Sequence, residues 1–110
     1  MDTLTRYRQL VRQELEEYAG FSANRSIRDE VIFDAERDRY LLVSIGWEGY
    51  RRVLQPIIRV DIINGKIWVQ EDNTDWPITE AFVNAGVPKE DIVLGFHPEH
   101  LRQHTGFAVS

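Results

Sequence analysis

The dipeptide Asn64-Gly65 constrains the fold more than any other feature of this sequence. It separates two strand-like runs, RVLQPIIRVDII (52–63) and KIWVQED (66–72), and both of its residues tolerate the positive φ angles of a type I′ hairpin turn. A two-residue turn also fixes which residues face each other across the hairpin. The predicted pairs are Ile63 with Lys66, Ile62 with Ile67, Asp61 with Trp68, Val60 with Val69 and Arg59 with Gln70. One face of the hairpin is then apolar, and the other carries Trp68 among polar side chains.

Two further strand-like runs, EVIFDAE (30–36) and RYLLVSIGW (39–47), flank a polar turn at Arg37-Asp38. The alternation in the second run predicts one face of Leu41, Val43, Ile45 and Trp47 and another of Tyr40, Leu42 and Ser44. We expect the first of these faces to join the apolar core face, and Leu42 to lie with Trp68 and Ile32 on the mixed face. Pro56 cannot donate a hydrogen bond to a strand ladder, so we expect a bulge or an edge position there.

Helical patterns lie on both sides of these strands. Residues 3–19 form an apolar stripe with steps of three and four, ending at Gly20; its members are Leu4, Tyr7, Val11, Leu15 and Tyr18. A coiled-coil seam is the alternative, but the stripe stops after two heptads, which favours a helix lying on a sheet. A second helix is expected from Pro77 to Gly86, then a buried run at 92–96 and a last helix from Pro98. The order predicts one α+β domain over residues 1–110: an N-terminal helix packed on a four-stranded antiparallel sheet, followed by short C-terminal helices.

Composition excludes several function classes. There is no cysteine, so disulfides and thiolate sites are ruled out. With 13 lysines and arginines against 18 aspartates and glutamates, the net charge of −5 opposes binding to phosphate backbones. Only Arg51, Arg52 and Arg59 offer a local basic patch, so direct nucleic-acid binding is not favoured. The polar N-terminus does not resemble a signal peptide and no run is long enough to span a membrane, so we expect a cytoplasmic protein.

All three histidines lie in DIVLGFHPEHLRQH (91–104). His100 and His104 are four residues apart and would share a helical face, which makes them weak candidate metal ligands. Leu101 follows His100 where a metalloprotease helix would need a glutamate, and His97 precedes a proline. The acidic run EDNTD (71–75) could bind magnesium, but acidic residues there also cap a following helix. We therefore predict no catalytic residue, metal or cofactor, and keep a small metal-dependent nuclease or hydrolase using His100, His104 and an acidic residue as the alternative.

Three stretches together resemble the XisI-like family of fdxN-element excision controlling factors. They are YRQLVRQELEEYA, VDIINGKIWVQEDNTD and AGVPKEDIVLGFHPEHLRQHTGFAVS. The resemblance implies a cyanobacterial type of protein that assists a site-specific recombinase in excising a DNA element during heterocyst differentiation. It also implies a companion of the XisH type, whose family looks endonuclease-like. The resemblance transfers no catalytic residue to this sequence.

We therefore expect a non-enzymatic accessory factor that controls excision by binding a protein partner, namely an XisH-type companion and a recombinase. The predicted binding residues are Trp68, Arg59, Asp61 and Gln70, because an aromatic side chain with polar neighbours is typical of an interface hot spot. Coverage of Trp68 by the C-terminal helices, as a second core layer, remains an open alternative. Homodimer formation also remains open.

Overall fold

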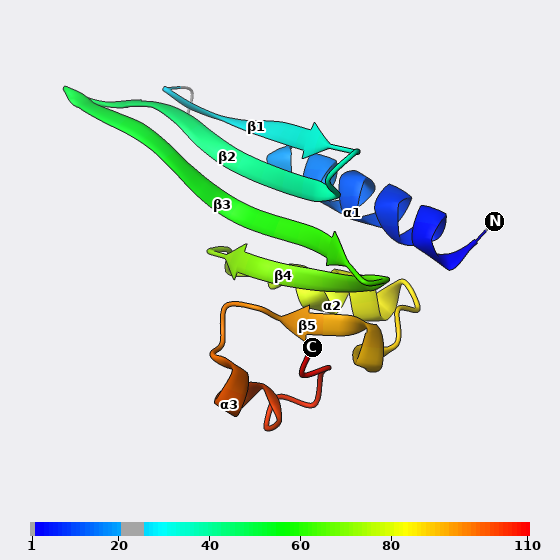
Figure 1. Cartoon of the computed structure of the whole chain (residues 1–110). Helices are drawn as coiled ribbons and strands as arrows, with labels where there is room; N and C mark the ends of the chain where they lie inside the picture. The colour runs from blue at the N-terminus through cyan, green and yellow to red at the C-terminus, as the bar shows by residue number, and fades with distance from the viewer. Residues whose placement is uncertain (1, 21–25) are drawn as a thin grey trace.

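The computed structural model describes residues 2–20 and 26–110 and has an α+β fold, as predicted. Its elements are α1 (Thr3–Ala19), β1 (Ile27–Asp34), β2 (Arg39–Glu48), β3 (Arg51–Ile63), β4 (Lys66–Asp72), α2 (Ile78–Asn84), a 3-10 turn η1 (Lys89–Asp91), β5 (Ile92–Leu94) and α3 (Glu99–Arg102). The strands form one sheet in the order β1-β2-β3-β4-β5 (Figure 1). Among the described residues, α1 and α2 lie on one side of this sheet.

The prediction of four antiparallel strands was wrong, because the sheet is mixed and has a fifth strand. β5 pairs in parallel with β4, with Ile67 opposite Ile92 and Val69 opposite Leu94. Parallel neighbours need a crossover connection, and the segment containing α2 provides it. The three residues of β5 are all buried, so their sequence shows no alternation that would identify a strand.

The turn at Asn64-Gly65 forms as predicted. Asn64 has a φ of 52° and Gly65 a φ of 77°, so both residues adopt the positive angles of a type I′ turn. The first four predicted pairs, from Ile63–Lys66 to Val60–Val69, are confirmed. The fifth was wrong, because a register shift next to Val60 pairs Arg59 with Glu71 instead of Gln70.

The residues of β2 divide between two faces as predicted, but the choice of the face that joins the core was wrong. Tyr40 pairs with Val60 and therefore lies on the helix-covered face, where Tyr40 and Leu42 are buried. Leu41, Ile45 and Trp47 lie on the opposite face. The polar groups on the buried face have partners: the Tyr40 hydroxyl donates to Asp38 over 3.0 Å and the Ser44 hydroxyl donates to Asp29 over 2.8 Å. These bonds remove the cost of burying hydroxyl groups, so hydrophobicity alone selects the wrong face.

Pro56 occupies the irregular position expected of it. The β2–β3 register shifts between Leu42 and Val43, opposite Pro56 and Ile58. The pairing of β3 with β4 ends at Ile58, so the outer edge of β3 has no strand neighbour at Pro56. The hairpin formed by residues 43–56, called the arm below, extends past β4 at the end of the sheet where α1 terminates, and its tip beyond Gly46 also extends past β1 (Figure 1).

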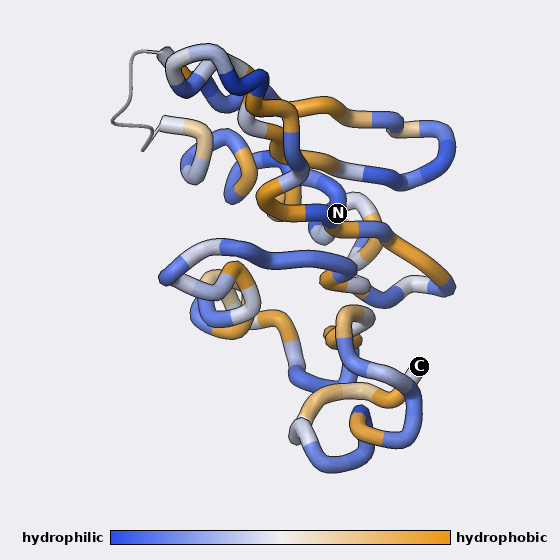
Figure 2. Tube along the Cα trace, turned by 90° about the vertical axis from the view of Figure 1, so that its left-hand side faces the viewer, coloured by the Kyte–Doolittle hydropathy of each residue, from blue (hydrophilic) through white to orange (hydrophobic). Residues whose placement is uncertain are grey.

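The core lies between the sheet and the helices. Helix α1 contributes Tyr7, Val11 and Leu15, and α2 contributes Ile78 and Phe82. They pack on the helix-covered face of the strands, whose fully buried members include Leu42, Ile58, Val60, Ile67, Val69 and Ile92. Hydrophobic stretches alternate with hydrophilic ones along the trace, as amphipathic elements around one core require (Figure 2).

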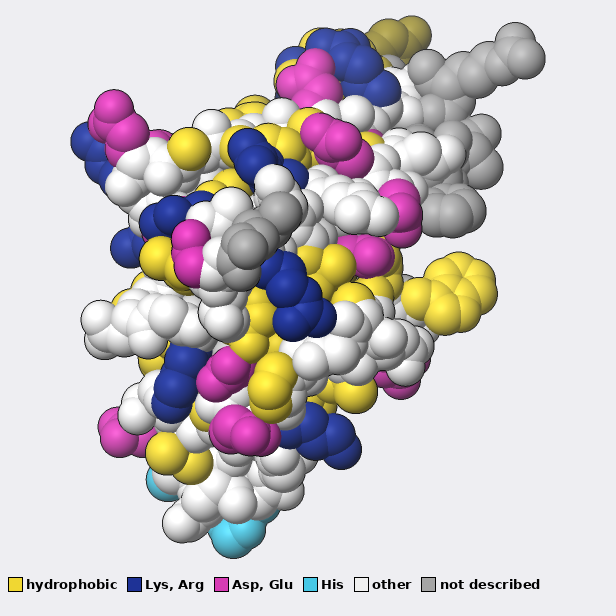
Figure 3. Space-filling model, turned by 90° about the vertical axis from the view of Figure 1, so that its right-hand side faces the viewer, with side chains coloured by type: hydrophobic (Ala, Val, Ile, Leu, Met, Phe, Trp, Pro, Cys, Tyr) yellow, Lys and Arg dark blue, Asp and Glu magenta, His cyan; other side chains and the backbone are white. Residues whose placement is uncertain are grey.

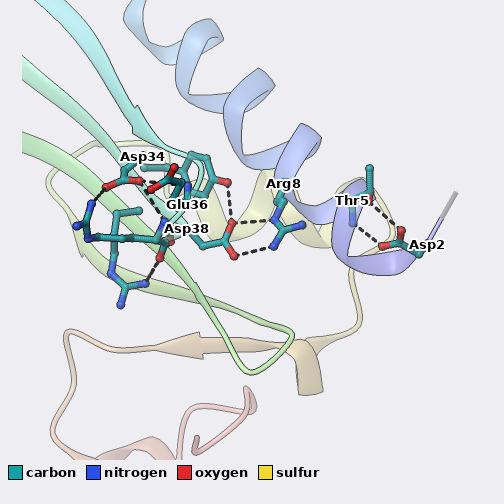
Figure 4. Close-up of polar contacts among 9 residues, drawn as sticks. Asp2, Thr5, Arg8, Asp34, Glu36 and Asp38 are labelled. Carbon is teal, nitrogen blue, oxygen red and sulfur yellow. Dashed lines mark hydrogen bonds and ion pairs between the residues drawn. The ribbon is translucent and has the colours of Figure 1, made fainter.

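Several polar contacts attach α1 to the rest of the fold, and two of them involve carboxylates. The Tyr7 hydroxyl donates a 2.5 Å hydrogen bond to Asp91, and burial together with this bond raises the pKa of Tyr7 to about 12. Arg8 donates two hydrogen bonds, of 2.8 and 2.9 Å, to the carboxylate of Asp38 in the β1–β2 turn (Figure 4). These hydrogen bonds from Arg8 lower the pKa of Asp38.

Candidate protein-binding face

The side of the sheet opposite α1 and α2, called the helix-free face below, carries a buried carboxylate at its centre. Arg39, Asp61 and Trp68 stand in one row across β2, β3 and β4. Asp61 is only 3% exposed, yet its carboxylate has partners on both sides. It accepts hydrogen bonds from Arg59 over 3.1 and 3.2 Å and from Gln70 over 3.2 Å, and Arg39 lies 3.6 Å away. The network therefore fixes the positions of two guanidinium groups at the surface.

Trp68 is half-buried beside this network. The guanidinium of Arg102 lies over its ring, 5.1 Å from the ring centre. Gly95 packs closely against another part of the ring, because a β-carbon at this position would lie only 3.2 Å from Trp68 Cε3. The segment after β5 thus covers part of Trp68 and leaves part of the indole at the surface.

The four predicted binding residues therefore lie together on one face, although the register shift places Arg59 opposite Glu71 instead of Gln70. Two members of the cluster were missed by sequence reasoning. Arg39 faces Asp61 across β2 and β3, and a correct register for this strand pair would have identified it. Arg102 comes from α3, and no pattern in the sequence connects that helix with β4.

An apolar strip continues from this network toward the arm. Ile32, Trp47 and Leu54 are each more than half exposed, and Leu41 and Ile45 are half-buried between them. A hollow of about 190 Å³ borders the strip; it is lined by Ile32, Asp34, Arg39, Tyr40, Leu41 and Arg59. Exposed apolar side chains beside fixed charges are characteristic of surfaces that bind proteins.

The histidines do not form a comparable site. His100 and His104 are exposed, and the half-buried His97 packs its ring 4.6 Å from that of Phe96. The histidine side chains visible in Figure 3 lie at the lower edge of the molecule, in the C-terminal region. Within residues 2–20 and 26–110, no group of three or more His, Cys, Asp or Glu side chains is arranged to hold a metal ion.

The acidic run 71–75 has a structural role at its centre. The Asp72 carboxylate accepts hydrogen bonds from the backbone of Ile78 over 2.7 Å and of Thr74 over 3.0 Å. Asp72 thus satisfies a free N–H group at the start of α2, as an acidic residue at that position commonly does. Glu71 accepts a hydrogen bond from the side chain of Asn73 over 3.0 Å.

The predicted basic patch is divided between two regions. Arg59 is bound to Asp61 on the body of the sheet, whereas Arg51 and Arg52 lie at the tip of the arm. Arg51 is paired with Glu48, and the guanidinium of Arg52 lies 5.1 Å from the ring centre of Trp47. These three arginines therefore do not form one continuous surface for a phosphate backbone.

Comparisons with known proteins agree with this fold. The family model described as XisI protein matches residues 1–109. A crystal structure of a XisI-like protein from Anabaena variabilis ATCC 29413 has a TM-score of 0.92 and 38% identity, over 97% of this chain and 99% of that chain. The crystal structure of fdxN element excision controlling factor XisI from the same organism has a TM-score of 0.85 and 39% identity, over 99% of this chain and 100% of that chain. No curated protein matches the sequence. In the described part of the chain, the helices lack the combined length and apolar character needed to cross a bilayer.

Proposed function

The chain belongs to the XisI family, and we propose that it is a non-enzymatic controlling factor that acts in the excision of a DNA element by binding a protein partner. The first support is its similarity over the full length to the excision controlling factor XisI. The second is the helix-free face, whose groups are suited to recognition. Its charged groups are held in ion pairs and its apolar groups lie at the surface, so it offers binding energy without an activated nucleophile or base.

The observation that carries this proposal is the position of Trp68 beside the Arg59–Asp61–Gln70 network. A large aromatic ring next to fixed guanidinium groups has the composition of an interface hot spot. Because Asp61 already orients the Arg59 guanidinium, little side-chain freedom is lost when a partner binds there. We propose that the partner is a companion of the XisH type, which with the recombinase supplies the contacts to DNA.

The charge of the chain supports an indirect route to DNA. A net charge of −5 repels phosphate backbones, whereas an acidic protein is attracted to the basic surface of a DNA-binding one. In this proposal the chain acts in the cytoplasm, controls when the companion and recombinase assemble, and leaves cleavage to them.

A reconstituted excision assay tests this function. Cells carry a reporter element with its recombinase and the XisH-type companion, and the excised circle is quantified with and without this chain. We expect excision to depend on the chain, to fall with Trp68→Ala, and to persist with His100→Ala and His104→Ala. Excision that is lost in the histidine variants and kept in Trp68→Ala would replace this proposal with the metal-dependent nuclease. Excision that does not depend on the chain would refute the controlling role.

A further inference from the structure

A cleft of about 590 Å³ lies in the helix layer, where α1 ends and α2 begins. Tyr18, Trp76 and Ala81 provide mainly apolar walls, and Glu14 and Thr74 complete them. The Tyr18 hydroxyl donates a hydrogen bond to the carbonyl of Trp76, which links two walls of the cleft. The volume is within the range of roughly 300–1,000 Å³ that is typical of binding pockets.

Among the described residues that line the cleft, Glu14 is the one charged side chain, and it is acidic. Burial raises the pKa of Glu14, and the nearby Glu17 adds to this effect. Glu80 is close enough to act electrostatically on Tyr18. Among the described residues, Glu14, Glu17 and Glu80 form no ion pair. An occupant that combines an aromatic or aliphatic body with a positive charge would therefore fit both the walls and the charge.

The tip of the arm has this combination. Tyr50, in the turn between β2 and β3, is fully exposed, and Trp47 beside it is half exposed. Glu48 is balanced by Arg51, so the positive charge of Arg52 is left over at the tip. The arm is 14 residues of hairpin, and its two strands reach roughly 20 Å from the irregularity at Pro56. An exposed aromatic side chain on a projecting hairpin is a surface that a partner would bury.

The arm and the cleft lie at the same end of the molecule. β1 begins at Ile27, opposite Gly46 at the base of the arm tip. α1 ends at Ala19, and this end of the helix lies on the same side of the molecule as the arm (Figure 1). Because the arm points away from the body, it does not fill its own cleft. Two copies related by a two-fold axis at this end can bring each arm to the cleft of the other, and a two-fold arrangement closes without forming a filament.

We propose that two copies of this chain exchange arms, so that Tyr50 and Arg52 of each copy occupy the cleft formed by Glu14, Tyr18, Trp76 and Ala81 of the other. The apolar walls bury the Tyr50 ring, and the carboxylate of Glu14 receives the guanidinium of Arg52. This interface lies in the helix layer and on the arm tip. It therefore leaves Trp68 and the Asp61 network on the helix-free face available to a different partner.

Sedimentation equilibrium of the purified chain, up to about 1 mM, tests the exchange. We expect a monomer–dimer equilibrium that Tyr50→Ala weakens about tenfold or more. Tyr50 is fully exposed, so this substitution leaves the fold intact, which circular dichroism verifies. Leu101→Ala is the matched control, because it removes an exposed apolar side chain from α3 and should leave the equilibrium unchanged. A wild-type chain that stays monomeric throughout this range would overturn the proposal, as would a dimer that Tyr50→Ala does not weaken.

A charge exchange distinguishes this interface from any other dimer. Arg51→Glu with Arg52→Glu reverses the charge of the arm, and Glu14→Lys reverses the charge of the cleft. In each reversed protein alone, the arm and the cleft carry charges of the same sign and repel each other. Each should therefore be monomeric. In a mixture of the two reversed proteins, each arm meets a cleft of opposite charge at both contacts. The mixture should therefore form a heterodimer. A mixture that stays monomeric, or reversed proteins that still dimerise alone, would show that the arm does not enter the cleft.

Discussion

The guanidinium of Arg102 lies 5.1 Å from the centre of the Trp68 ring. The same side chain donates hydrogen bonds to the carbonyl of His97 over 3.0 Å and to that of Val109 over 3.3 Å. Arg102 therefore holds the C-terminal segment together and attaches it to β4. This contact between distant parts of the sequence therefore contributes to the partial covering of the Trp68 ring on the helix-free face.

Replacing Arg102 with alanine should loosen the C-terminal segment. It removes two hydrogen bonds and a cation–π contact at a partly exposed site, so we expect a loss of about 1 kcal/mol in the free energy of unfolding. Hydrogen exchange followed by mass spectrometry should show faster exchange in peptides from residues 97–109. Arg37→Ala, in the exposed β1–β2 turn, is the control. Unchanged protection in residues 97–109 would mean that Arg102 does not hold this segment.

Removing the Asp61 carboxylate should destabilise the protein. Asp61→Ala leaves Arg39 and Arg59 without their shared carboxylate, but both guanidiniums are partly exposed and can be rehydrated. We therefore expect a loss of about 1–2 kcal/mol, below the cost of breaking a fully buried pair. Urea unfolding measures it. A variant as stable as the wild type would indicate that the network adds nothing to the fold.

Asp38→Asn should destabilise the protein at neutral pH and have no effect in acid. Hydrogen bonds from Arg8 lower the pKa of Asp38 below its ordinary value of 3.8, so the ion pair stabilises the fold above that pH. The contribution is lost as the pH falls through the lowered pKa of the folded state. Asn also suits the φ of 55° at this position, so the substitution changes the charge while sparing the backbone. We expect a difference of about 1 kcal/mol at pH 7, converging toward zero below pH 3.8 in chemical unfolding. A difference that does not change with pH would contradict the ion-pair explanation.

Tyr7→Phe removes the hydrogen bond between α1 and the 3-10 turn before β5. The loss should be about 1–2 kcal/mol at pH 7, because the bond is made to a carboxylate. The pKa of Tyr7 is raised from 10.0 to about 12. A raised pKa means that the contribution of the protonated hydroxyl is complete below pH 10 and is lost as the pH rises toward 12. Unfolding curves of wild type and Tyr7→Phe should therefore approach each other between pH 10 and 12, and curves that stay parallel would be inconsistent with a buried Tyr7 donor.

Local features of the sequence predicted the local parts of the fold. Asn64-Gly65 determines its own turn and four cross-strand pairs, because both residues adopt angles that few others tolerate. The faces of β2 depend on partners elsewhere: Ser44 is buried because Asp29 of another strand accepts its hydroxyl hydrogen. β5 is a strand because a crossover brings it beside β4, and its three apolar residues carry no signal of that.

The residues of the candidate site also separate into those that local sequence features predicted and those that they could not predict. Trp68 and Asp61 were placed together because the hairpin register puts them opposite each other. Gln70 reaches Asp61 even though the register shift moves it away from Arg59, because its side chain spans the difference. Arg102 is 34 positions from Trp68 and approaches it through the packing of α3, which no local periodicity determines.

The most direct test of the helix-free face is a calorimetric titration of the XisH-type companion into wild-type chain and Trp68→Ala. The control is Arg12→Ala, which removes an exposed side chain from α1 on the other side of the sheet. With both variants shown to be folded by circular dichroism, we predict that Trp68→Ala weakens binding by about 2 kcal/mol or more, roughly 30-fold, and that Arg12→Ala binds as the wild type does. Equal affinity of the Trp68→Ala variant and the wild type would contradict the assignment of this face as the binding surface.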